Sequence, residues 1–267
     1  MSNESITKKI NILKIDDGFR SNITDEVVSE YSLSIIVNNE HLVTLICSKC
    51  NLQELAVGHL FSNGLISSFC DIVELVIAEG ETRAVVNLYI DNRIENSKNA
   101  EKNQKIITSS SGRQFSYCED MINKLKKDER NVNIVKFDSK KILDSVKTFC
   151  NESEGFNLTG GIHSCKLCGP CELVIHREDI GRHNAFDKVI GAALIENVDF
   201  QESYIITSGR VPSDMVIKAV TTGVPLLVSK SAPTDVSVQI AQEMGLCLIG
   251  FARGKRLNLY TFPNRII

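Results

Sequence analysis

The chain of 267 residues is long enough for one large domain or two small ones, and its 43% hydrophobic residues are enough for a packed core. Its formal net charge of −3 gives no overall basic field, so we expect no nucleic-acid partner. Without a long apolar run or an apolar signal region, we expect a cytoplasmic protein that spans no membrane, with nine cysteines that are thiols or metal ligands rather than disulfides.

The chain begins with a polar stretch, residues 1–25, that lacks strong periodicity, and we expect a loose arm or an edge strand there. Residues 31–47 follow, with two apolar runs rich in β-forming side chains. The runs are separated by Asn38 and Asn39, a pair that is typical of a tight turn. The sequence therefore predicts a β-hairpin after the arm.

A helix is predicted after this hairpin, because Asn51 can cap it and Gly64 can end it. Residues 72–90 then contain two more apolar runs around a central glycine, which predict a second pair of strands. Together these elements predict a small α+β domain over residues 1–110.

A polar stretch, residues 92–120, separates the two halves of the chain and contains three consecutive serines followed by Gly112. Such a composition predicts a flexible loop or a domain linker, with Cys118 just beyond its serines. Asp138 then caps a predicted helix in which Cys150 occupies an apolar position, so we expect Cys150 in the core.

The remainder of the chain alternates between strands and helices, which is typical of an α/β layer with a largely parallel sheet. We assign residues 111–267 to this α/β domain. The predicted strands are residues 173–175, 204–207, 224–228 and 246–251, and the predicted helices are residues 183–194, 212–222 and 234–244.

Three connections follow the carboxyl ends of the predicted strands, which is where α/β sheets bind ligands. They are residues 208–210, 229–234 and 252–256, and all are small, polar or basic. That composition favours an anion-binding site.

Cysteines and histidines concentrate between residues 155 and 188. Cys165, Cys168 and Cys171, which we call the cysteine cluster, are spaced like metal ligands and follow His163 closely. A structural zinc ion is therefore one hypothesis, although four ligands within nine residues is tight packing. The pair Cys47 and Cys50 would complete a zinc site only if the fold brings it close.

Two catalytic alternatives for the cysteine cluster fit less well. Cys168 and Cys171 have the spacing of a thioredoxin-type redox pair, but that motif needs a helix at its first cysteine and residues 172–177 predict a strand. Zinc deaminases need a His-x-Glu motif, and neither His163 nor His183 is followed by a glutamate two residues later. We expect neither activity.

A dense polar patch follows the cysteine cluster, at a predicted helix start. Glu178 and Asp179 precede Arg182 and His183, and Asp187 lies about one helical turn further on, so it can share a helix face with them. A surface cluster of ion pairs would explain the patch as well. We favour a functional polar wall next to a cysteine loop.

Several of these segments, in this order, resemble the formate dehydrogenase accessory protein family (FdhD/NarQ) over about residues 25–262. They are residues 52–66, Thr159–His163, Glu178–Lys188, Ser208–Arg210, Ser231–Thr234 and Gly250–Phe251 with Asn258, Tyr260 and Thr261.

The resemblance implies a cytidine-deaminase-like α/β domain with a mixed, largely parallel sheet, preceded by a small α+β domain. It implies a sulfurtransferase that takes persulfide sulfur from a cysteine desulfurase and passes it to the molybdenum of the bis(molybdopterin guanine dinucleotide) cofactor that formate dehydrogenase requires. It also implies a homodimer. We expect this cofactor to be a bound client, and we expect no catalytic metal of the protein's own.

The sequence departs from the family at the acceptor cysteine, whose position matches Ser111, and a serine hydroxyl cannot form a persulfide. The candidate acceptors are therefore Cys118 and the cysteine cluster, Cys165, Cys168 and Cys171. Alternatively, the protein binds the cofactor as a carrier or chaperone without transferring sulfur. A zinc-stabilised interaction domain is a third hypothesis.

The family's guanine-dinucleotide segment matches a basic stretch here that follows the last predicted strand. Its residues are Phe251, Ala252, Arg253, Gly254, Lys255 and Arg256. Arg253, Lys255 and Arg256 supply positive charge suited to a pyrophosphate. The further residues expected at the cofactor site are His163, Arg182, His183, Ser208 and Arg210.

Overall fold

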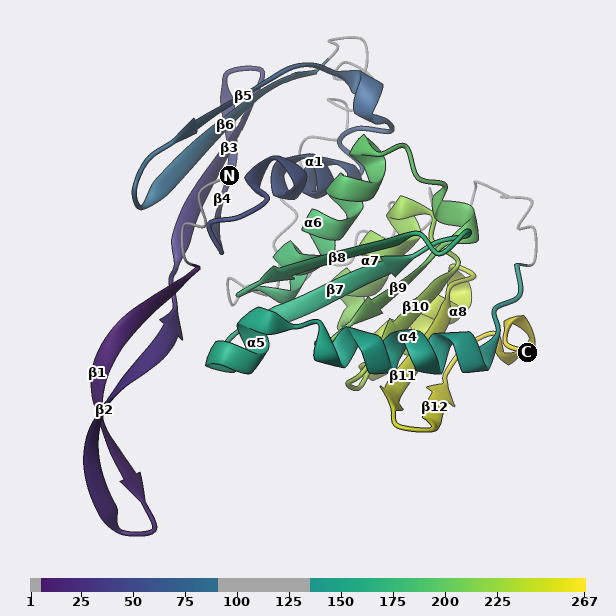
Figure 1. The fold of residues 1–267 in the computed structure, drawn as a ribbon. Helices are drawn as coiled ribbons and strands as arrows, with labels where there is room; N and C mark the ends of the chain where they lie inside the picture. The colour runs from purple at the N-terminus through teal and green to yellow at the C-terminus, as the bar shows by residue number, and fades with distance from the viewer. Residues whose placement is uncertain (1–5, 91–134) are drawn as a thin grey trace.

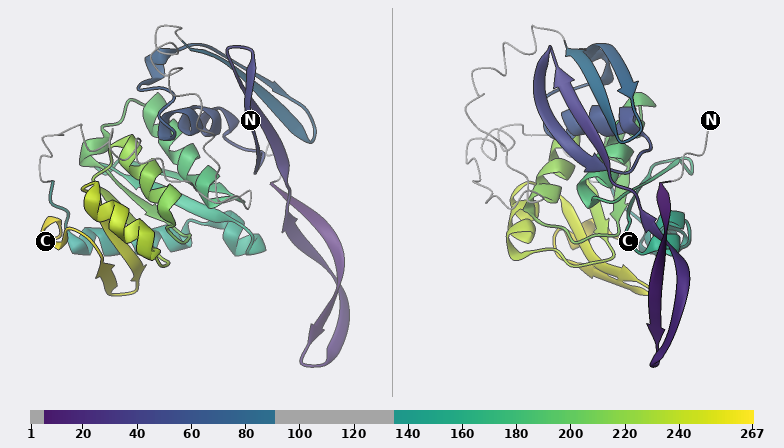
Figure 2. Two further views of the ribbon diagram at one scale, coloured as in Figure 1. Left: turned by 180° about the vertical axis from the view of Figure 1, so that it is seen from behind. Right: turned by 90° about the vertical axis from the view of Figure 1, so that its left-hand side faces the viewer.

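The computed structural model describes residues 6–90 and 135–267, so Ser111, Cys118 and the predicted linker lie outside the described residues. The described chain contains a two-stranded arm, a four-stranded sheet and a six-stranded sheet (Figure 1). The arm projects away from the two larger sheets, and helices lie between those sheets (Figure 2). No helix among the described residues is long and apolar enough to cross a membrane.

The arm consists of two antiparallel strands, β1 (Thr7–Asp16) and β2 (Phe19–Val28). Asp17 and Gly18 connect them with φ values of 46° and 82°, and such a pair of positive φ values is typical of a two-residue hairpin turn. Of the two alternatives, a loose arm or an edge strand, the structure has strands, and they pair with each other as a hairpin. The hairpin was missed because apolar residues of β1 occupy both faces, which hides the alternation.

The four-stranded sheet has the order β4-β3-β6-β5. The hairpin predicted around Asn38 and Asn39 is confirmed, and both residues have positive φ. Asn51 precedes helix α1 as predicted, but it has left-handed backbone and its side chain makes no capping bond. The elements are β3 (Tyr31–Val37), β4 (Glu40–Cys47), α1 (Leu52–Ser62), η1 (Phe69–Asp71), β5 (Ile72–Glu79) and β6 (Arg83–Ile90).

The six-stranded sheet has the order β12-β11-β10-β9-β7-β8 and is mixed. A mixed sheet was expected and is confirmed, but the expectation that it is largely parallel was wrong, because only the β9–β10 and β10–β11 pairings are parallel and the other three are antiparallel. The strands are β7 (His163–Cys168), β8 (Val174–Asp179), β9 (Tyr204–Thr207), β10 (Leu226–Ser229), β11 (Cys247–Arg253) and β12 (Arg256–Leu259).

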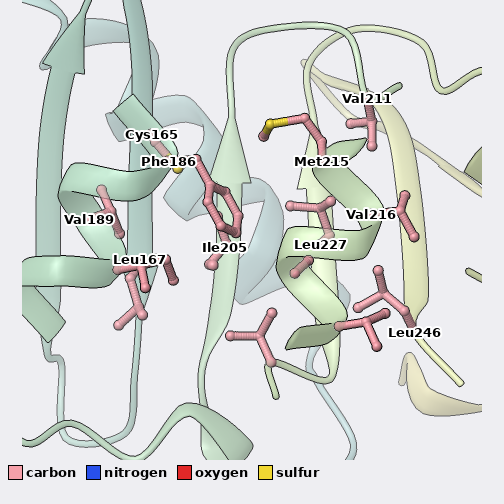
Figure 3. Close-up of a cluster of buried hydrophobic side chains, with 14 of the residues drawn as sticks. Cys165, Leu167, Phe186, Val189, Ile205, Val211, Met215, Val216, Leu227 and Leu246 are labelled. Atoms are coloured by element: carbon pink, nitrogen blue, oxygen red, sulfur yellow. The ribbon is translucent and has the colours of Figure 1, made fainter. Parts of the chain in front are cut away.

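Helices cover both faces of this sheet. One face packs against α6 (Arg182–Ile195), α7 (Ser213–Thr222) and α8 (Asp235–Glu243), and Figure 3 shows part of that apolar core. The other face packs against α4 (Ser139–Asn151), whose predicted cap is confirmed because Asp138 accepts hydrogen bonds from two backbone amides of the first turn. The short elements are α5 (Glu154–Thr159), η3 (Phe200–Glu202) and η4 (Pro263–Arg265).

Helices α1 and α6 cross so closely that their backbones are in contact, and this crossing joins the two larger sheets. A Cβ atom on Gly58 would overlap the carbonyl oxygen of Asp187, and one on Gly191 would overlap that of Glu54. Glycine is therefore required at both positions, and the crossing fixes how the four-stranded sheet sits on the six-stranded sheet.

Candidate functional site

The carboxyl ends of β9, β10 and β11 lie at one edge of the six-stranded sheet, which we call the carboxyl edge. Because β7 runs antiparallel to β9, β7 begins at this edge with His163, which pairs with Asp179 at the end of β8. Helix α6 begins three residues after β8 ends. The carboxyl edge thus collects the predicted residues His163, Arg182, His183, Ser208, Arg210 and the segment 251–256.

His163, Ser208 and Arg182 are close neighbours at the centre of this edge. Nδ1 of His163 lies 3.3 Å from Oγ of Ser208. A Cβ atom on Gly209 would lie 3.1 Å from Cδ of Arg182 and 3.5 Å from Cε1 of His163, so the bare backbone of Gly209 lets both side chains pack over it. Burial, and then the charge of Arg182, lowers the pKa of His163, which favours its neutral imidazole.

Asp214 supplies a negative charge beside Arg182 and His183. Its Oδ2 lies 2.9 Å from Nε2 of His183, close enough for an ion pair although not oriented as a hydrogen bond. Burial lowers the pKa of Arg182, Asp214 opposes that shift, and Arg210 adds to it. The sequence analysis missed Asp214, and its position in the first turn of a predicted helix beside the 208–210 connection was the available signal.

The segment 251–256 comprises the end of β11, the turn formed by Gly254 and Lys255, and the first residue of β12. Phe251 has a φ of 51°, and the guanidinium carbons of Arg253 and Arg256 lie 5.6 and 5.8 Å from its ring centroid. Arg253, Gly254, Lys255 and Arg256 are exposed, whereas Ala252 is buried in the core. The segment therefore presents three cations to solvent around the half-buried ring of Phe251, and the buried Ala252 anchors its backbone in the core.

Asp187 is not part of the wall that the sequence predicted, because it is buried between α1, α6 and α7. Nζ of Lys218 lies 2.6 Å from its Oδ2, and Oγ of Ser62 donates a hydrogen bond of 2.7 Å to its Oδ1. Nδ1 of His59 lies 3.2 Å from Oδ2. Burial alone would raise the pKa of Asp187, but Lys218 and then His59 lower it to about 2. This network is a structural one at the junction of the two larger sheets.

A second buried network holds Asp179 and Lys188. Their Nζ and Oδ2 atoms are 2.6 Å apart, and both side chains are fully buried. Asp179 also accepts hydrogen bonds from the amide of Ser48 (3.0 Å) and from Nδ2 of Asn184 (2.9 Å). Much of the predicted polar patch therefore fastens the end of β4 to α6, and only Arg182 and His183 among its predicted site residues face the carboxyl edge.

The cysteine cluster does not form a loop beside the carboxyl edge. Cys165 and Cys168 lie within strand β7, on opposite faces of the sheet, and both are buried. Burial raises the pKa of both thiols. Cys171 is exposed with a φ of 54°, in the turn after β7 at the opposite edge of the sheet. The arrangement disfavours Cys165 and Cys168 as nucleophiles and separates Cys171 from His163 and Arg182.

No group of three potential metal ligands is present among residues 6–90 and 135–267. The strand conformation explains why the zinc hypothesis finds no support there, since His163, Cys165 and Cys168 are distributed along β7. Cys50 lies instead beside Lys188, whose Nζ is 3.4 Å from its Sγ. Burial raises the pKa of Cys47 to about 12.

The family model described as the FdhD/NarQ family matches residues 28–267. A sulfur carrier protein FdhD from Bacillus pumilus is 35% identical over 99% of each chain, and one from Bacillus subtilis is 32% identical over 99% of each chain. A crystal structure described as a formate dehydrogenase accessory protein from Desulfotalea psychrophila matches with a TM-score of 0.79 and 23% identity, over 98% of this chain and 100% of that chain. At that identity the structural likeness shows the fold alone.

Proposed function

Because the chain belongs to the FdhD/NarQ family, we propose that it is a sulfur carrier in the maturation of formate dehydrogenase. It takes persulfide sulfur from a cysteine desulfurase and passes it to the molybdenum of the bis(molybdopterin guanine dinucleotide) cofactor. Relatives that share about a third of its residues over nearly their whole length are named sulfur carrier proteins, which supports the general activity.

The observation that carries this proposal is the chemistry of the carboxyl edge. Arg210 follows β9, and Arg182 at the start of α6 packs over the neighbouring Gly209. The exposed cations of the 251–256 segment lie two strands away, roughly 10 Å along the edge. Guanidinium groups pair with phosphate oxygens, and Phe251 offers a ring that can stack on a base. These residues fit the anionic guanine-dinucleotide tail of the cofactor.

The sulfur step requires an accessible thiolate. That thiolate attacks the outer sulfur of the donor persulfide, a new S–S bond forms, the donor's S–S bond breaks, and the donor cysteine leaves as a thiolate that takes up a proton. Of the candidate acceptors, Cys171 is exposed, Cys165 and Cys168 are buried, and Cys118 lies outside the described residues. We therefore place acceptor function on Cys118 or Cys171.

A carrier that binds the cofactor without transferring sulfur is the second candidate function. Ser111 at the family's acceptor position favours it, as does the burial of Cys165, the cluster thiol nearest to His163. In this case the carboxyl edge is the whole functional site.

Mass spectrometry separates the two functions. The intact protein is incubated with a cysteine desulfurase and cysteine, and the sulfur carrier is expected to gain 32 Da per sulfur atom, mapped to the peptide of Cys118 or Cys171. Variants Cys118→Ala and Cys171→Ala identify the acceptor, and Cys165→Ala is the buried control. A protein that gains no sulfur, yet binds the nucleotide, is the carrier of the second function.

The finer description of the fold belongs to the same proposal. We propose that residues 111–267 form a cytidine-deaminase-like domain and that residues 1–110 form the smaller α+β domain. The boundary between them lies outside the described residues.

A further inference from the structure

Cys50 is a half-buried thiol beside the end of strand β8, at the carboxyl edge. Nζ of Lys188 lies 3.4 Å from Sγ of Cys50 and 2.6 Å from Oδ2 of Asp179, which is the last residue of β8. Asp179 pairs directly with His163 in the antiparallel ladder, so these two side chains lie on the same face of the sheet. Cys50 is therefore close to the centre of the candidate site, although the sequence pattern did not assign it there.

The connection between β4 and α1, which carries Cys50, is fastened to this edge by hydrogen bonds. The backbone amide of Ser48 donates to Oδ2 of Asp179 (3.0 Å), and Oγ of Ser48 accepts from the backbone amide of Ile180 (3.2 Å). The amide of Cys50 donates to the carbonyl oxygen of Ser48 (2.8 Å). The position of the thiol is therefore set by the fold, as a reacting group requires.

Lys188 supplies a hydrogen-bond donor and a positive charge to the sulfur. Its side chain is fully buried. Burial would lower the pKa of Lys188, but Asp179 and then Cys50 raise it above its ordinary value, so the side chain stays an ammonium. Hydrogen bonds from an ammonium to an anion are about twice as strong as those between neutral groups. Because a persulfide is a stronger acid than its parent thiol, Lys188 stabilises a persulfide anion on Cys50 more than the thiol.

Cys50 and the 251–256 segment lie towards opposite ends of the carboxyl edge. Four strand spacings separate β11 from β8, which is roughly 19 Å. Arg210, Arg182 and His163 lie between the two ends. A dinucleotide substrate whose guanine binds at the 251–256 segment would therefore extend along the edge towards Cys50.

We infer that Cys50 holds persulfide sulfur at the carboxyl edge, an inference that rests on the proposed function and adds a thiol to it. Cys50 gives its proton to solvent, and its thiolate attacks the outer sulfur of a donor persulfide on the desulfurase or on the acceptor thiol. The new S–S bond forms, the donor's S–S bond breaks, and the donor leaves as a thiolate that takes up a proton from solvent.

Exchange with glutathione persulfide tests this thiol without any partner protein. The full chain is equilibrated with glutathione persulfide and excess glutathione, alkylated, and digested with trypsin and Glu-C, which separates the peptides of Cys47, Cys50 and Cys70. Cys70 is the control thiol, because it is exposed in η1, which follows the end of α1, whereas Cys50 precedes its start. The ratio of persulfide to thiol should be at least about tenfold higher at Cys50. An equal or lower ratio at Cys50 would overturn the inference.

A pair of double variants tests the role of the ammonium. Lys188→Gln with Asp179→Asn removes both charges of the buried pair and should lower the ratio at Cys50 about tenfold or more. Lys166→Gln with Glu152→Gln removes another buried lysine and its partner, and should leave that ratio unchanged. Circular dichroism checks that each variant folds. If the first variant does not fold, the comparison of Cys50 with Cys70 in the wild type still decides.

The same mapping with a cysteine desulfurase and cysteine separates this inference from the proposed function. Sulfur on Cys118 or Cys171 that never reaches Cys50 would support the proposed function and overturn the inference. Sulfur on Cys50 from glutathione persulfide, with none on any cysteine from the desulfurase, would support the assignment of Cys50 and contradict the proposed function.

Discussion

Asp187 and Lys218 form a buried ion pair, and their surroundings decide how much the pair matters to stability. Ser62 and His59 occupy the remaining positions around the carboxylate, so all of its partners come from within the protein. A buried pair of this kind need not stabilise more than an apolar pair of equal volume, but either charge alone is costly.

Replacing Asp187 by Asn leaves the Lys218 ammonium buried without its counter-charge. We expect the free energy of unfolding, measured in urea, to fall by about 3–5 kcal/mol. The double variant Asp187→Leu with Lys218→Met removes both charges and should lose less than the single variant. A loss below about 1 kcal/mol for Asp187→Asn would contradict the network described for the α1, α6 and α7 junction.

His59 makes stability depend on pH. Burial lowers the pKa of His59 in the folded protein, so below about pH 6.5 the unfolded chain binds the proton more readily. The free energy of unfolding should therefore fall from pH 7 to pH 5. It should fall further below about pH 4, because Asp187 has a pKa of about 2 in the folded protein and is therefore protonated first in the unfolded chain.

The variant His59→Gln should reduce the change in unfolding free energy between pH 7 and pH 5. It should not abolish that change, because burial lowers the pKa of His163 and His176 as well. A variant with the full wild-type change would show that His59 is not buried as described.

At the scale of elements, the sequence predicted those whose apolar pattern is regular. Strand β9 was predicted to the residue, and α4 with its Asp138 cap was predicted within a residue at its start. Strand β7 was missed because its run of cysteines, lysine and serine reads as a site. Lys166 is nevertheless buried there, with its Nζ 2.7 Å from Oε2 of Glu152.

The candidate site was likewise predicted only in part from the sequence. Connections 208–210 and 252–256 were predicted from strand order alone, and the fold places them at the carboxyl edge as expected. The cysteine cluster was misplaced because two of its thiols belong to a strand interior, which spacing cannot distinguish from a ligand loop. Asp214 was missed because its position in the first turn of a predicted helix does not reveal its partner, His183, which is 31 residues away in the chain.

The crossing of α1 and α6 leads to a prediction at this scale. In an ordinary helix Gly→Ala would stabilise by about 1 kcal/mol. Gly191→Ala should instead destabilise by about 1–3 kcal/mol or more, since its Cβ would overlap the backbone of Glu54. Thermal unfolding followed by circular dichroism checks the sign, and a raised melting temperature would contradict the close crossing.

At the scale of the whole molecule, the two larger sheets have different roles. The six-stranded sheet carries the candidate site at its carboxyl edge. The four-stranded sheet is joined to it through the close crossing of α1 and α6. The buried networks of Asp187 and Asp179 lie at this junction, so the residues that hold the sheets together are distinct from the cations at the edge. Substitutions at the edge should therefore alter binding with little effect on stability.

The most direct test of the account is the binding of GDP, a mimic of the guanine-dinucleotide tail, by calorimetry. Loss of a charge-assisted hydrogen bond costs about 1.5–3 kcal/mol, so Arg253→Ala should weaken GDP binding about tenfold or more, and high salt should weaken it too. Lys140→Ala removes the same charge from the exposed first turn of α4 and should bind GDP like the wild type. No detectable binding to the wild type, or equal affinities of the Arg253→Ala and Lys140→Ala variants, would contradict the assignment of the carboxyl edge as the nucleotide site.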